Sequence, residues 1–266
     1  ENVLESALST GGDFSEIFVE DKYVNQLVLQ SNKLEKSNSG RDFGIGIRIF
    51  LGLQSIYTYT TDFSEEGLIQ AAKRAAHASQ GGSAGIIHPL QKEIIQPLHT
   101  IALKPRSVEN LRKVSVMRQA NDIARGFDPR IKQVGIRYID EEQNVLIANS
   151  EGKFVEDTRV YSRLSIQATA SDGIEMQTGF YGPGAHAGFE FIENLNLEHY
   201  AGEAARIAVN MLGAEECPSG KFPVIIDNEF GGVIFHEACG HGLEATSVAK
   251  NNSVFANRIG ERVAPD

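Results

Sequence analysis

The chain has 266 residues, and 41% of them are hydrophobic, which is enough for a buried core and suggests one large or two modest domains. Its net charge of −10 and pI near 5.2 argue against a nucleic-acid-binding surface, because phosphate binding needs clustered lysine and arginine. No stretch approaches the ~18 continuous apolar residues of a membrane-spanning helix. With only two cysteines the sequence offers no disulfide framework, which favours a cytoplasmic location.

The first third of the sequence is predicted to be rich in strands, with a helix at each end. A short helix is expected over residues 3–8. Alternating apolar residues or β-branched residues then predict strands at 15–20, 23–31, 34–37, 44–51 and 54–60. Residues 62–64 should cap a second helix that runs to about Ser79, because two glutamates occupy its first turn, where the helix dipole favours negative charge.

The middle of the chain repeats this pattern after an interruption. Residues 80–106 are interpreted as a surface excursion or linker, because glycines and three prolines break the periodicity. Ser107 is predicted to cap a long helix that ends near Phe127, with apolar residues at three- or four-residue spacing. Further strands are expected at 134–139, 144–149, 154–156, 161–171 and 174–181, followed by a helix at 197–212.

These elements indicate an α+β fold of largely antiparallel sheets with helices packed on them. A strand-rich segment followed by one helix occurs twice, which favours two weakly similar repeats. We expect an N-terminal α+β domain over residues 1–217 and the start of a metal-site domain over 218–266. A strand at 222–226, an N-cap at 227–228 and a glycine turn at 231–232 should lead into the next helix.

That next helix carries the most chemically dense stretch of the chain. His236 and His241 can each offer a neutral ring nitrogen to Zn²⁺, and Glu237 can accept a proton from an attacking water molecule. The spacing is one residue longer than the familiar His-Glu-x-x-His. In a regular helix the two histidines would therefore lie about 140° apart, with Glu237 on a different side of the helix from His236. A π-bulge, eased by Gly240, would bring both rings onto one face.

Other readings of this stretch remain open. His236 and His241 could be two structural histidines satisfied by hydrogen bonds. Glu244 could be a further ligand, could orient His241, or could be a plain surface charge. Cys239 is a second candidate ligand, but a free cysteine is more often a small buried hydrophobic residue, and we expect that role.

Several segments resemble the TldD/PmbA family, whose TldD-type subunit carries His-Glu-x-x-x-His and whose PmbA-type partner lacks it. The similar segments are 12–20, 41–48, 180–184, 232–250, 253–255 and 259–264. The resemblance implies a cytoplasmic metallopeptidase subunit that acts on unfolded or flexible polypeptides. It also implies a PmbA-like homologous partner or self-association.

The same resemblance implies that the third metal ligand is a cysteine well downstream of the two histidines. Neither Cys217, which precedes the motif, nor Cys239, which lies inside it, fits that description. We therefore expect the chain to be an N-terminal portion of a longer protein, with its third ligand outside this sequence and no activity alone.

The sequence predicts a zinc-dependent peptidase subunit in which His236 and His241 hold the metal and Glu237 transfers the proton. The alternative is a non-catalytic binding or scaffolding subunit, or an inactive truncated form. Metal content and cleavage of a flexible peptide would distinguish them. Another divalent metal is also compatible with such ligands.

Overall fold

The computed structural model describes residues 1–79, 83–228 and 231–264. The chain divides into two compact units. The first consists of Glu1–Leu51 and Ser55–Glu215, and the second of Gly52–Gln54 and Glu216–Asp266. The first unit contains the body of the sheet and its helices, and the second contains the His-Glu-x-x-x-His segment.

One eight-stranded sheet organises the first unit, in the order β3-β2-β1-β5-β6-β4, with β7 and β8 also pairing with β6. The short strand β4 runs parallel to β6, whereas β1 pairs antiparallel with β2 and β5, and β6 with β5, β7 and β8. The strands are β1 (Phe14–Gln30), β2 (Lys33–Leu51), β3 (Gln54–Thr60), β4 (Gln91–Glu93), β5 (Ile131–Asn149), β6 (Lys153–Ser171), β7 (Met176–Tyr181) and β8 (Gly184–Ala185). The predicted α+β class with a largely antiparallel sheet is confirmed.

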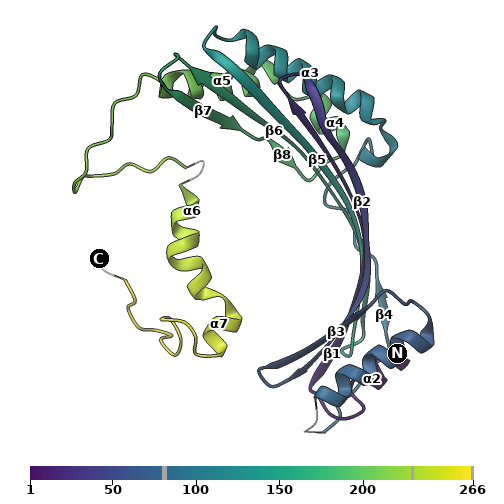
Figure 1. Ribbon diagram of the computed structural model, residues 1–266. Coiled ribbons are helices and arrows are strands. Elements are labelled where there is room, and N and C mark those ends of the chain that lie inside the picture. Colours follow the sequence, from purple (N-terminus) through teal and green to yellow (C-terminus); the bar gives the residue numbers. More distant parts are fainter. Residues whose placement is uncertain (80–82, 229–230, 265–266) are drawn as a thin grey trace. The chain divides into compact units, whose positions relative to one another are not determined.

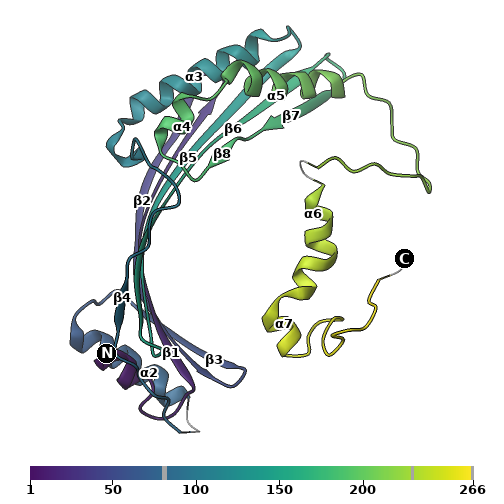
Figure 2. The same ribbon diagram turned by 180° about the vertical axis from the view of Figure 1, so that it is seen from behind.

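Helices cover one face of this sheet in two groups (Figures 1 and 2). Two helices pack near one end of the long strands and three near the other. The helices are α1 (Asn2–Ala7), α2 (Glu65–Ala78), α3 (Asn110–Gly126), α4 (Phe189–Glu193) and α5 (Leu197–Met211). No helix in the described part of the chain is long and apolar enough to cross a membrane.

Each group of helices encloses its own hydrophobic core. The larger core lies between α3, α4, α5 and strands β1, β5 and β6, where Tyr138 and Phe189 are fully buried with ring centroids 6.0 Å apart. The smaller core joins α1 and α2 to β2 through Ile47 and Ile49. Helices α2 and α5 each contribute four buried alanines, so both can approach the sheet closely.

The order of elements repeats along the first unit. Helix α1, strands β1 to β3 and helix α2 are followed by helix α3, strands β5 to β7 and helix α5, with four short elements inserted. Antiparallel pairing of β1 with β5 joins the two halves into one sheet. The two-repeat pattern expected from the sequence is therefore present in the order of elements.

The strands are longer than the sequence pattern predicts, because neighbouring predicted strands merge into β1, β2, β5 and β6. Polar residues that suggest turns instead form cross-strand pairs, as in Arg41 of β2, whose guanidinium donates to Asp21 of β1 at 2.6 Å. A ladder partner on each side holds β1 extended through its charged middle.

Of the predicted N-caps of α2 and α3, the first is confirmed and the second is wrong. Ser64 caps α2 as expected, since its hydroxyl accepts a hydrogen bond from the backbone N–H of Gly67 at 3.1 Å. Ser107 does not cap α3. Its backbone N–H closes a 3₁₀ turn, Pro105–Ser107, by donating to the carbonyl of Lys104, and its hydroxyl donates to the same carbonyl. Helix α3 begins at Asn110, after Glu109.

The predicted excursion at 80–106 also contains a sheet element. Its first three residues, 80–82, lie outside the described part of the chain. Beyond them the backbone is mainly irregular, but β4 adds three residues beside the start of β6. The segment is thus anchored to the sheet through Gln91–Glu93.

The second unit is a short helical segment with extended chain before it. Its elements are α6 (Gly232–Phe235), a π turn (His236–Gly240), a 3₁₀ turn (His241–Leu243) and α7 (Ala245–Ala249). The predicted strand at 222–226 is wrong: these residues are irregular, and Ile225 is fully exposed. A strand needs a pairing partner, and no described residue pairs with this segment. The N-cap is Gly231, not a residue at 227–228.

Candidate metal centre

The two histidines of the motif meet because the helix widens between them. The backbone N–H of His241 donates to the carbonyl of His236, five residues earlier, which is the hydrogen bond of a π turn. As predicted, this turn places both imidazoles on one face, with ring centroids 4.5 Å apart and planes at 71°. A regular α-helix would direct the rings about 140° apart.

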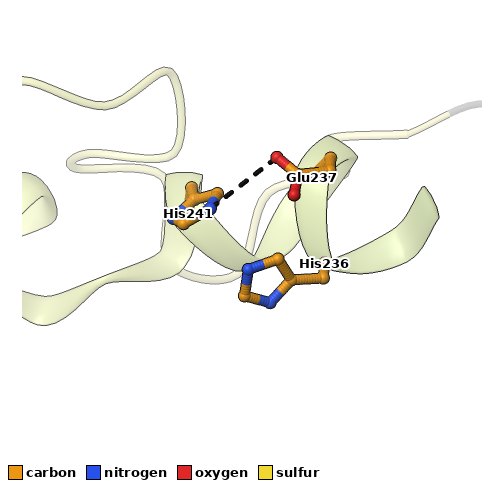
Figure 3. A group of neighbouring side chains, drawn as sticks. All are labelled: His236, Glu237 and His241. Atoms are coloured by element: carbon orange, nitrogen blue, oxygen red, sulfur yellow. Dashed lines mark ion pairs between the residues drawn. The ribbon is translucent and has the colours of Figure 1, made fainter. Parts of the chain in front are cut away.

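Glu237 pairs with His241, four residues further along the helix. Its Oε2 lies 3.7 Å from Nε2 of His241, and Figure 3 shows this ion pair beside the ring of His236. Ligand atoms of His236, Glu237 and His241 all lie within 4.8 Å of one another. Glu237 follows His236 directly in the chain, so the two side chains leave the helix in different directions, as the sequence predicts, and their ends still come close together.

Glu244 contacts the ring nitrogen Nδ1 of His241. The Nδ1 of His241 lies 2.8 Å from Oε1 of Glu244. This hydrogen bond, together with the negative charges of Glu237 and Glu244, raises the pKa of His241 above its ordinary value. Of the three roles left open by the sequence, the geometry favours orientation of His241, since a carboxylate on Nδ1 fixes the ring and leaves Nε2 available.

The side chains of this segment are open to solvent in the second unit. His236, Glu237 and His241 are all exposed. Cys239 is also exposed, which contradicts the buried role expected for it. None of the residues from Gly232 to Ala249 is buried. Phe235 on the same helix is 67% exposed.

The donor set suits a divalent transition metal. Two imidazole nitrogens and a carboxylate oxygen are ligands that Zn²⁺ accepts, and three such donors lie within 4.8 Å of one another. The signal for this arrangement was present in the sequence, as the five-residue spacing of the histidines. The contact between Glu244 and His241 follows from their i, i+3 spacing on the same helix.

Family models match three successive parts of the chain. They are described as the PmbA/TldA metallopeptidase domain 1, central domain and C-terminal domain, and they match residues 15–79, 103–212 and 219–266. The chain belongs to the PmbA/TldD family.

Curated and solved relatives agree with this membership. The chain is 28% identical over 270 residues to a "Metalloprotease TldD homolog" of Buchnera aphidicola, and the match covers 99% of this chain and 56% of that protein. The chain thus spans about half the length of this curated relative.

Two solved structures share the fold. A proposed modulator of DNA gyrase from Bacteroides thetaiotaomicron has a TM-score of 0.78 at 17% identity, over 98% of this chain and 60% of that one. TldE from Thermococcus kodakarensis has a TM-score of 0.58 at 14% identity, over 77% and 46%. The PmbA/TldD chain described here therefore has the fold of both.

Proposed function

We propose that this chain forms part of a zinc-dependent peptidase subunit that hydrolyses peptide bonds in unfolded or flexible polypeptides. The observation that carries the proposal is the π turn, which gathers His236, Glu237 and His241 within 4.8 Å. Membership of a family described as metallopeptidases supports the reaction class.

Each residue of the group has a role in the proposed reaction. His236 and His241 bind the metal through ring nitrogens. When bound, Zn²⁺ supplies Lewis-acid chemistry, which polarises the substrate carbonyl and makes water more acidic. The Glu237 carboxylate accepts a proton from the water as its oxygen attacks the carbonyl carbon. Glu237 then returns the proton to the amine nitrogen as the C–N bond breaks.

Glu244 acts as a positioning residue in this scheme. Its carboxylate accepts the Nδ1–H of His241, which selects the tautomer whose Nε2 carries a free lone pair. Because Glu244 does not belong to the three-residue donor group, we assign it no place on the metal. Cys239 remains a less favoured candidate ligand.

We further propose that the third protein ligand lies outside this chain, in a metal-site domain that begins near residue 218. A catalytic zinc site ordinarily has three protein ligands and one open position. If Glu237 moves protons, only His236 and His241 remain as ligands in the described group. The greater length of the curated relative leaves room for the missing one.

The proposed assembly is a cytoplasmic complex with a PmbA-like homologous subunit, or a self-associated form. The fold shared with TldE supports pairing between related subunits. A strictly monomeric mass for the full-length protein mixed with such a subunit would contradict this part of the proposal.

Metal analysis and peptide cleavage with the full-length protein test the proposal. The wild type should contain zinc, lose cleavage of a flexible peptide on chelation and regain it with Zn²⁺. His236→Ala should lose both zinc and cleavage, whereas His77→Ala, which removes an exposed histidine on α2, should lose neither. A full-length protein that binds no metal, or that cleaves equally well after chelation, favours the non-catalytic scaffolding alternative.

A further inference from the structure

The face of the sheet turned away from the helices is hollowed over β1, β5, β6 and β7. Side chains alternate between the two faces of a strand, so the residues next to the buried core residues point to this side. The hollow has a volume of about 730 Å³, within the range typical of ligand sites. We call it the sheet groove and define it by Gln30, Gln133, Arg137, Arg163, Gln167 and Phe180.

A glycine shapes the bottom of the sheet groove. A Cβ atom at Gly135 of β5 would lie 2.9 Å from the side-chain oxygen of Gln30 on the neighbouring strand. The missing side chain therefore lets the Gln30 amide lie over β5. A larger residue at this position would fill the hollow.

The polar lining is suited to main-chain amides. Besides the glutamines, the lining includes the hydroxyls of Ser165 and Thr169, and side chains of both kinds can donate and accept hydrogen bonds. Among the described residues, no aspartate or glutamate lines the groove. Phe180, which is 53% exposed, adds one apolar contact.

The sheet groove is positively charged, although the whole chain has a net charge of −10. Arg137 lies opposite Ser165 and Arg163 opposite Ile139, so the two arginines are diagonal neighbours on β5 and β6. Arg137 can donate to the amide oxygen of Gln26, which is neutral and leaves the positive charge uncompensated.

Neither groove arginine forms an ion pair with any described residue, whereas six of the other ten arginines on the first unit do. The ion-paired arginines are Arg41, Arg48, Arg112, Arg130, Arg159 and Arg206. Glu141 of β5 is the other diagonal neighbour of Arg163, and the two residues line an adjoining hollow without forming an ion pair. The sheet groove is thus a basic surface whose two arginines are not ion-paired with any described carboxylate.

We propose that the sheet groove binds an extended polypeptide segment that carries carboxylates. The amide and hydroxyl side chains hydrogen-bond to the bound main chain, and Arg137 and Arg163 pair with its acidic side chains. From Gln133 to Ile139 the groove follows six steps of β5, about 20 Å, which matches about six extended residues. The groove lies wholly in the first unit, and the proposal does not depend on the metal centre.

Binding of labelled peptides to the 266-residue chain tests this, measured by fluorescence anisotropy. A peptide of about twelve alternating Glu and Ser residues should bind, and a Lys/Ser peptide of equal length should not. Arg137→Gln/Arg163→Gln should weaken binding about tenfold or more. Arg118→Gln, which removes an exposed arginine from α3, should change it by less than about twofold.

A charge reversal provides a second variant. Arg163→Glu should abolish binding of the Glu/Ser peptide and should confer binding of the Lys/Ser peptide, because the groove then carries a carboxylate. Melting temperatures and circular dichroism of all variants should match the wild type, since both arginines are exposed.

Four results would overturn the proposal. The first is that the Glu/Ser peptide does not bind, and the second is that Arg118→Gln weakens peptide binding as much as the double variant does. The third is that a single-stranded oligonucleotide of equal charge binds more tightly than the peptide. The fourth is that the wild type sediments as a dimer and Arg137→Gln/Arg163→Gln does not. The third would identify a nucleic acid as the occupant, and the fourth a second copy of this chain.

Discussion

At the scale of single residues, Lys113 of α3 forms a buried ion pair with Asp140 of β5. Its Nζ lies 2.7 Å from Oδ2 of Asp140, and the side chains are 2% and 5% exposed. Asn25 also donates to this carboxylate at 3.1 Å. The pair fixes α3 over the sheet, and removal of one partner leaves a charge buried without its counter-ion.

We predict that Lys113→Met destabilises the chain by about 3–5 kcal/mol, because Asp140 remains buried and unpaired. Urea denaturation measures the loss. Arg112→Met breaks the neighbouring exposed pair with Glu193 and should cost about 1 kcal/mol or less. The double variant Lys113→Met/Asp140→Leu should recover most of the stability. Equal costs for the two single variants would refute a special role for burial.

The second residue-scale prediction concerns Glu244. In the full-length protein Glu244→Ala should weaken zinc binding about 10- to 100-fold, because the Nδ1 of His241 loses the carboxylate that orients its ring. Glu244→Gln keeps a side-chain oxygen in place and should restore part of the affinity. Glu261→Ala, whose carboxylate pairs with Arg258, is the matched control. Unchanged zinc affinity in Glu244→Ala would leave Glu244 as a plain surface charge.

At the scale of elements, helix α5 packs closely against β7 because a glycine of β7, Gly179, lies at the contact. A Cβ atom at Gly179 would collide with the carbonyl oxygen of Ala204, whereas one at Gly202 on α5 meets nothing within 4 Å. We predict that Gly179→Ala destabilises the first unit by about 1–3 kcal/mol through overpacking. Gly202→Ala should stabilise it by about 0.5–1 kcal/mol through helix propensity. Thermal unfolding measures both, and a neutral Gly179→Ala would show that α5 can shift away from the sheet.

The spacing of apolar residues along the sequence predicted most helices and strands, because this spacing is regular in the helices and in most parts of the long strands. It failed where an element depends on distant partners. The apolar run at 222–226 has the pattern of a strand, but in the described residues it has no pairing strand. Conversely, β1 continues through Asp21 and Lys22 because strands on both sides hold it extended.

The sequence predicted the candidate metal centre but not the sheet groove. The five-residue spacing of His236 and His241 on one helix requires a π turn if both rings are to converge, and that turn is formed. The contact between Glu237 and His241 follows from their i, i+4 spacing. Arg137 and Arg163 are far apart in sequence, so only the register of β5 against β6 brings them together.

At the scale of the whole molecule, the isolated 266-residue chain should bind Zn²⁺ weakly and should not cleave peptides. With Glu237 assigned to proton transfer, two histidines remain as ligands, and both are exposed. Calorimetric titration with Zn²⁺ should therefore give low affinity that a chelator reverses. A tight one-to-one site that Glu244→Ala or Cys239→Ala destroys would show that the ligand set is complete within this chain.

The central claim is the division of roles between two metal-binding histidines and a proton-transferring glutamate. Zinc content and peptide cleavage of full-length Glu237→Gln, measured on the same preparation, test it most directly. Glutamine keeps the size of the side chain but accepts no proton, so we predict full zinc content with cleavage lowered by about 10²-fold or more. Loss of zinc in Glu237→Gln, or wild-type cleavage by it, would contradict the claim.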